Sequence, residues 1–175
     1  MEDYKMFSYY GTKKRLARLY PAPLYDTIIE PFAGAAGYSL LYPHKNVILY
    51  DTNPKICSIW EYLIKSSKDD ILNLPDIKQG QKVTDFNLNK DQQYLIGFCI
   101  NPGSANPKIT ASQRTSWNRY KINIANSVHK IKHWKIFNMS YENIHNIEAT
   151  WYIDPPYQKV GKYYFGYNQM NYTKL

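Results

Sequence analysis

Residues 151–157, which read Trp-Tyr-Ile-Asp-Pro-Pro-Tyr, constrain the fold more than any other part of the chain. They begin as a short apolar run, which predicts a buried strand over residues 151–153. Two consecutive prolines donate no backbone hydrogen bonds and cannot continue a central strand, so the strand must end at Asp154. Open α/β sheets bind ligands at the carboxyl ends of their strands. The Asp154 carboxylate is therefore predicted to lie at a ligand-binding edge.

Asp154, Pro155, Pro156 and Tyr157 form the candidate catalytic group. The exocyclic amino nitrogen of adenine is a poor nucleophile because its lone pair is delocalised into the ring. The Asp154 carboxylate and the Pro155 carbonyl are both acceptors, so they can hold its two N–H groups and direct the lone pair toward an electrophile. The Tyr157 ring can stack on the base. An ordinary turn is the alternative, since Asp-Pro commonly opens turns.

A strand predicted over residues 25–31 runs into a turn of small residues and then a helix-like pattern over residues 38–41. This order is typical of a nucleotide-type cofactor site. Gly34 lets the backbone approach a ligand closely, and Gly37 lets the helix pack tightly on the strand. Phe32 stands where the dinucleotide fingerprint has its first glycine, which weakens a phosphate-cradling interpretation.

The next strand is predicted over residues 47–50 and ends at Asp51. An acid at the end of the second strand is placed to accept hydrogen bonds from ribose hydroxyls. Asp51 could instead cap the helix predicted to carry Ile56 and Leu63, and both roles can hold together. A further strand is predicted over residues 134–138.

Composition favours a nucleic-acid partner and one domain. The 175 residues carry a net charge of +8 and 18 tyrosines, which supply cations for phosphates and rings for bases. A merely basic soluble protein would show the same balance. No apolar run is long enough to span a membrane, and the polar N-terminus is unlike a signal peptide. Two cysteines indicate reduced thiols in a cytoplasmic protein, and the scattered histidines complete no metal site.

Residues 66–131 lack the strand–helix rhythm of residues 1–65 and 132–175, so we interpret them as an inserted helical lobe on an α/β core. The apolar run at residues 94–100 fits either a strand or a buried helix. Four side chains of the lobe suit DNA contact, although a lobe that packs on the core would look similar. They are Arg114, Trp117, Asn118 and Arg119.

A second basic segment lies near the N-terminus. Thr12 is predicted to cap a helix that carries Leu16, Leu19 and Tyr20 on one face. Lys14 and Arg15 would sit at its start, where cations oppose the helix dipole. This conflict indicates phosphate binding, and a solvated face is the alternative.

In this order, the motifs at residues 32–34, 51 and 154–157 resemble those of the D12 class of S-adenosylmethionine-dependent DNA adenine-N6 methyltransferases, especially phage and prophage adenine methylases. The resemblance covers essentially the whole chain. It implies a Rossmann-like fold with sheet order 3-2-1-4, S-adenosylmethionine as cofactor, and double-stranded DNA as substrate. It also implies a bacterial or phage-infected host cytoplasm.

The resemblance assigns roles residue by residue. It places the methionine part of the cofactor on Phe32, Ala33 and Gly34. It places the ribose on Asp51, and the cofactor carboxylate on Gly11 and Lys13. Ser140 and Tyr141 stand where the family often has Asp-Phe, so Ser140 is the expected hydrogen-bonding group for the cofactor adenine. The catalytic motif, in which the acid also borders the cofactor, corresponds to Asp154, Pro155 and Tyr157.

The expected sheet has fewer strands than the resemblance implies. Methyltransferases of this fold use seven strands, whereas only four can be counted here, and the strand at residues 151–153 would have an unpaired edge. We therefore expect a truncated fragment, a partner chain that supplies the missing strands, or a homo-oligomer. Two other functions stay open, namely a non-catalytic DNA- or partner-binding module and a methyltransferase that acts on RNA or a protein amide.

Overall fold

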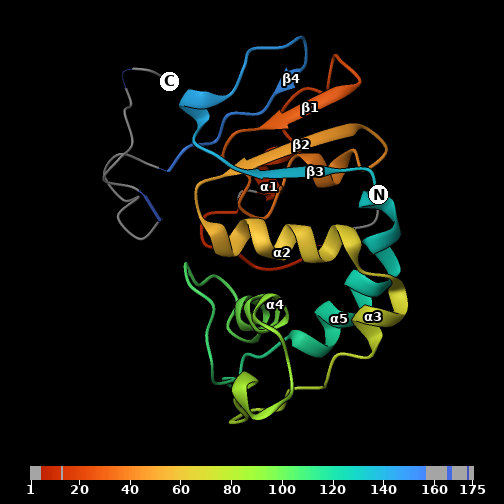
Figure 1. Ribbon diagram of the computed structural model, residues 1–175, viewed down its shortest axis with the longest axis vertical. Coiled ribbons are helices and arrows are strands. Elements are labelled where there is room, and N and C mark those ends of the chain that lie inside the picture. The colour runs from red at the N-terminus through yellow and green to blue at the C-terminus, as the bar shows by residue number, and fades with distance from the viewer. Residues whose placement is uncertain (1–4, 13, 157–164, 167–172, 174–175) are drawn as a thin grey trace.

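The computed structural model describes residues 5–12, 14–156, 165–166 and 173, without the side chains of residues 14 and 15. A parallel four-stranded sheet in the order β3-β2-β1-β4 forms its centre (Figure 1). This confirms the predicted α/β class and strand order. The strands are β1 (Thr27–Glu30), β2 (Asn46–Asp51), β3 (Lys135–Asn138) and β4 (Thr150–Trp151).

All four strands end at the same edge of the sheet, because every pairing is parallel. Ile29 aligns with Ile48 on one side and with Trp151 on the other. β4 ends at Trp151 rather than at Ile153 as predicted, although the Tyr152 N–H still donates to the Ile29 carbonyl at 2.9 Å. Asp154 thus lies beyond the strand end, after Tyr152 and Ile153.

Helix α2 (Pro54–Lys65) lies along one side of the sheet and packs against β2 and β3 (Figure 1). Its apolar residues recur at helical spacing and are buried, as predicted. Asn53 caps the helix, because its side-chain oxygen accepts the Lys55 N–H at 3.1 Å. The cap is therefore Asn53 and not Asp51, which leaves the Asp51 carboxylate available to the turn beside it.

The predicted lobe contains α3 (Lys68–Leu72), α4 (Lys90–Ile100) and α5 (Trp117–Ser127), and it lies on the far side of α2 from the sheet (Figure 1). Residues 94–100 are helical, which settles the ambiguity of that apolar run. Asn89 and Gln92 form a reciprocal capping box at the start of α4. Residues 95–100 are all buried, because α4 packs against both α2 and α5.

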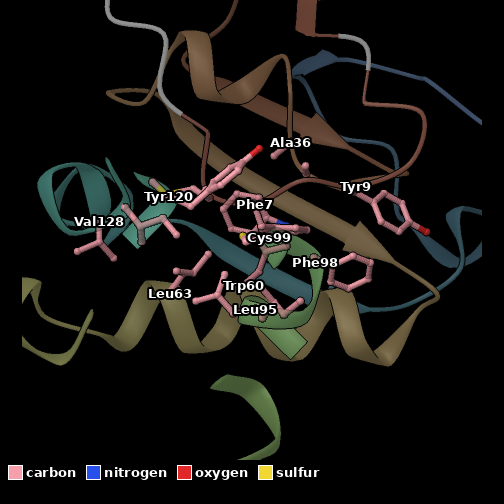
Figure 2. Packing of buried hydrophobic residues seen from close by; sticks show 14 of the residues in the cluster. Phe7, Tyr9, Ala36, Trp60, Leu63, Leu95, Phe98, Cys99, Tyr120 and Val128 are labelled. Carbon is pink, nitrogen blue, oxygen red and sulfur yellow. The ribbon is translucent and has the colours of Figure 1, made fainter. Parts of the chain in front are cut away.

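One buried hydrophobic cluster includes residues from both the predicted core and the predicted lobe. Figure 2 shows Phe7 beside Cys99 of α4, with Trp60 of α2 and Phe98 of α4 on the same side of its ring. The Phe7 ring lies 5.6 Å from the Trp60 ring and 5.9 Å from the Phe98 ring. The lobe is therefore packed onto the α/β part by a shared core, and its role as a separate unit stays a prediction.

Two predictions made from the sequence are wrong. Trp117 is fully buried and its indole N–H donates to the Pro75 carbonyl at 2.8 Å, so this ring is a core residue and cannot contact DNA. The helix near the N-terminus, α1, spans Lys14–Ala17, so Leu19 and Tyr20 lie beyond it rather than on one of its faces, and both are exposed. The Thr12 hydroxyl donates to the Tyr9 carbonyl at 2.8 Å, and its role as a cap stays a prediction because residue 13 lies outside the described residues.

No helix in the described part of the chain combines the length and apolarity that crossing a membrane requires.

Candidate active site

A cavity of about 280 Å³ opens where β1, β2 and β4 end. The strand ends bring together most of the residues that the sequence singled out for the site. Those that line the cavity are Gly11, Phe32, Ala33, Gly34, Asp51, Ser140, Asp154 and Pro156. Pro155 stands between two of these lining residues, whereas Lys13 and Tyr157 fall outside the described residues.

The turn after β1 needs a glycine at position 34. Gly34 has a φ of +46°, a conformation that side chains disfavour, and a Cβ there would lie 3.0 Å from Cδ1 of Tyr9. Its N–H donates to Asp51 Oδ2 at 2.9 Å, and its carbonyl accepts the Trp60 indole N–H at 2.8 Å. Hydrogen bonds to Asp51 of β2 and from Trp60 of α2 thus hold the turn in place.

Asp51 is held by two backbone donors. Oδ2 accepts the Gly34 N–H, and Oδ1 accepts the Asn53 N–H at 2.8 Å. Burial raises the pKa of this carboxyl to about 6, while the two hydrogen bonds oppose that rise. Each carboxylate oxygen keeps a further lone pair, which suits the predicted hydrogen bonds to hydroxyl groups at the cavity wall.

Aromatic rings form two further walls of the cavity. Phe32 lies 5.3 Å from Tyr141 between ring centroids, with the rings tilted by 40°. Tyr152 stacks on Tyr38 at 4.7 Å with the two rings almost parallel. The sequence reasoning named neither Tyr141 nor Tyr152 as a site residue, although both directly adjoin residues of predicted motifs.

Glu30 is the site residue that sequence reasoning missed most clearly. It ends β1, directly before the glycine turn, and lines the cavity while only 2% exposed. Its Oε1 accepts the Ser39 N–H at 2.7 Å. Burial raises the pKa of Glu30 to about 7, and the charge of Asp154 adds to that rise. A charged last residue on a predicted strand was the available signal.

The raised pKa of Glu30 makes the stability of the ligand-free chain depend on pH. The folded state binds this proton more tightly than the unfolded chain, whose value is 4.5. The resulting stabilisation is complete below that value and is lost as pH rises through about 7. Urea titrations from pH 5 to pH 8 should therefore show wild type losing on the order of 2–3 kcal/mol more than Glu30→Gln. Equal pH slopes in the two chains would contradict this, and Glu142→Gln, at an exposed lining residue, should keep the wild-type slope.

The predicted DNA-contacting residues lie outside this cavity. Arg114 and Arg119 are exposed, and exposed Asn118 accepts the Ile77 N–H at 3.2 Å through its side-chain oxygen. The side chains of Lys14 and Arg15 are not among the described ones. In the described part of the chain, histidine, cysteine and acidic side chains form no cluster suited to a metal ion.

A parallel sheet in this order, with a glycine turn after β1, an acid at the end of β2 and Asp-Pro-Pro after β4, is consistent with a Rossmann-like methyltransferase fold. The family model for D12 class N6 adenine-specific DNA methyltransferases matches residues 9–96, which is just over half of the chain. The chain belongs to this family and is a DNA adenine methyltransferase by class. A comparison with curated proteins found no match.

Proposed function

We propose that this chain transfers a methyl group from S-adenosylmethionine to N6 of a flipped-out adenine at a specific site in double-stranded DNA. The observation that carries the proposal is the single cavity that joins the turn at residues 32–34 to Asp154. A cofactor turn and an acceptor for an amino group must share one cavity if the methyl group is to pass directly between them.

The residues present fit this cofactor. S-adenosylmethionine supplies an electrophilic methyl group on a positively charged sulfur. The turn at residues 32–34 holds the methionine part, and Gly34 lets the Tyr9 ring pack closely against this turn. Gly11, together with Lys13, takes the carboxylate. Asp51 accepts the ribose hydroxyls with its remaining lone pairs, and Ser140 takes the adenine of the cofactor.

The chemistry at the base falls to the residues after β4. Asp154 and the Pro155 carbonyl accept the two amino N–H groups, Pro156 stiffens the turn, and Tyr157 stacks on the base. Flipping the adenine costs a few kcal/mol of unstacking, which contacts in the cavity offset. Holding the nitrogen in line with the methyl group supplies much of the rate.

The DNA itself is proposed to contact basic side chains outside the cavity. Arg114 and Arg119 are exposed cations of the lobe, and Asn118 offers an amide beside them. Lys14 and Arg15 would add phosphate contacts from the N-terminal side. The net charge of +8 favours this binding at low salt and weakens it at high salt.

A second chain is proposed at the open edge of β4. Within the described sheet, β4 pairs with β1 alone, and its other backbone edge is the proposed position for a further strand. Exposed Leu24 and Ile153 carry apolar surface from the segments next to the two strands. Either a second copy or a chain that supplies further strands would cover them, and light scattering on the purified chain distinguishes self-association from a monomer.

The test of the proposal is a methylation assay. The purified chain, of known oligomeric state, is incubated with S-adenosylmethionine and duplex DNA. After digestion to nucleosides, N6-methyl-2′-deoxyadenosine is quantified by mass spectrometry. We expect product from duplex DNA and little from RNA of the same sequence. Salt-sensitive DNA binding by a folded sample that forms no product would instead support a non-catalytic binding module.

A further inference from the structure

The cavity is acidic although the chain is basic. Its lining includes the four carboxyl groups of Glu30, Asp51, Glu142 and Asp154. Lysine, arginine and histidine are absent from the lining among the residues that the structure describes. The whole chain nevertheless carries a net charge of +8. Such a cavity repels phosphate and favours a ligand that brings positive charge.

Glu30 differs from the other three acids in its surroundings. It is only 2% exposed, whereas Glu142 is exposed and Asp154 is partly exposed. Asp51 is held by the backbone N–H groups of Gly34 and Asn53, whereas the hydrogen bonds that oppose the rise in the pKa of Glu30 all come from Ser39. Burial makes the Glu30 carboxylate costly to ionise despite these hydrogen bonds, so a nearby cation interacts with it more strongly than with a solvated acid.

The groups that face Glu30 strengthen this effect. Asp154 lies on the segment after β4, and its charge disfavours ionisation of Glu30. Tyr38, next to the Ser39 donor, has its pKa raised to about 12, first by burial and in part by the charge of Glu30. Asp51 and Glu142 line the same cavity. All of these described groups are acidic or neutral, so a positive charge on the ligand would stabilise the Glu30 carboxylate.

We propose that Glu30 senses the charge on the cofactor sulfur and favours the sulfonium substrate over the neutral thioether product. This inference rests on the proposed function, because it takes S-adenosylmethionine as the ligand of the cavity. It goes further by assigning to Glu30 the discrimination between S-adenosylmethionine and S-adenosylhomocysteine, which differ by one methyl group and one positive charge.

The reaction then changes the environment of Glu30 in a defined way. The amino nitrogen forms a bond to the methyl carbon, the carbon–sulfur bond breaks, and its electron pair stays on sulfur. The amino group releases one proton to solvent. The sulfur has lost its charge, so Glu30 has lost its cation and takes up a proton near neutral pH. S-adenosylhomocysteine therefore binds less tightly than it would in a cavity without the Glu30 carboxylate.

Titration calorimetry on the full chain tests this directly. S-adenosylmethionine and S-adenosylhomocysteine are titrated separately into wild type, Glu30→Gln and Glu142→Gln. Glutamine keeps the shape of Glu30 and an oxygen for the Ser39 N–H, so the fold should survive. We expect Glu30→Gln to weaken S-adenosylmethionine binding about tenfold and to change S-adenosylhomocysteine binding less than about twofold. Glu142→Gln, an exposed acid of the same cavity, should shift the ratio of the two affinities much less.

A second measurement follows proton release on cofactor binding and does not require methyl transfer. Near pH 7, titrations in buffers of different ionisation enthalpy should show wild type releasing protons when it binds S-adenosylmethionine but not when it binds S-adenosylhomocysteine. Glu30→Gln should abolish that release. An equal loss of affinity for both ligands would overturn the inference and leave Glu30 a structural group. Wild type that binds neither ligand would overturn the proposed function, and this inference with it.

Discussion

Replacing Asp154 by alanine should lower methyl transfer to adenine by a factor on the order of 10²–10³ or more and leave the fold and cofactor affinity nearly unchanged. The carboxylate is the charged acceptor proposed for the amino group, and its interaction strengthens as positive charge develops on that nitrogen. Asp154 follows β4, whose position depends on pairing with β1 rather than on this side chain. N6-methyladenine by mass spectrometry and cofactor affinity by calorimetry measure the two effects separately.

Two variants sharpen this experiment. Asp154→Asn keeps the size and one acceptor oxygen but removes the charge, so its activity should fall between those of wild type and Asp154→Ala. Glu148→Ala removes an exposed carboxylate from the segment before β4, outside the cavity lining, and should keep wild-type activity. Cofactor binding that disappears in folded Asp154→Ala would assign this residue to the cofactor instead, and full activity would remove it from the catalytic group.

The sheet could be predicted from the sequence because three of its four strands are followed by residues that end a strand. The β1 strand ends in a glycine turn, β2 ends in an acid followed by a capped helix, and two prolines follow β4. Such signals are local, and parallel pairing then places all the strand ends at one edge. Local signals therefore located the cavity before any contact was known.

Long-range packing decided what the sequence could not. Residues 94–100 are apolar on every side, so no periodicity distinguishes helix from strand, and the capping box at Asn89 was the overlooked local signal. Trp117 stands among basic and polar residues, which resembles a DNA-contacting group. The hydrogen-bond partner of its buried indole is the Pro75 carbonyl, which lies 42 residues away in the sequence. No pattern within the segment itself could supply that partner.

Glu30 shows a different limit of sequence reasoning. A charged residue at the end of a buried strand breaks the apolar pattern, and such breaks tend to occur at functional sites. The sequence could show the break but not its consequence. The energetic cost of this carboxylate depends on its burial and on Asp154, which is more than a hundred residues away along the chain and near in space. Its proposed role could be formulated only once these facts were combined.

Replacing Trp60 by alanine should destabilise the chain by about 3–5 kcal/mol, the largest effect on stability that we expect from one substitution. Trp60 is fully buried, and its ring lies 5.6 Å from the Phe7 ring and 5.7 Å from the Trp134 ring. Its indole N–H also holds the Gly34 carbonyl at 2.8 Å, so one side chain supports both the core and the cofactor turn. Urea unfolding measures the loss, which is a large fraction of the total stability of a typical domain.

Trp60→Phe separates the two contributions if the alanine variant fails to fold. Phenylalanine retains most of the apolar packing but leaves the Gly34 carbonyl without its donor, so stability should fall by about 1–3 kcal/mol and cofactor affinity should fall with it. Trp151→Phe is the matched control, because the Trp151 indole N–H donates to the Ile147 carbonyl at 3.1 Å in an exposed position. Water can replace that bond, so the control should change stability by less than about 0.5 kcal/mol. If the two phenylalanine variants behave alike, the bond from Trp60 does not position the turn, and Asp51 and Tyr9 must hold Gly34 without it.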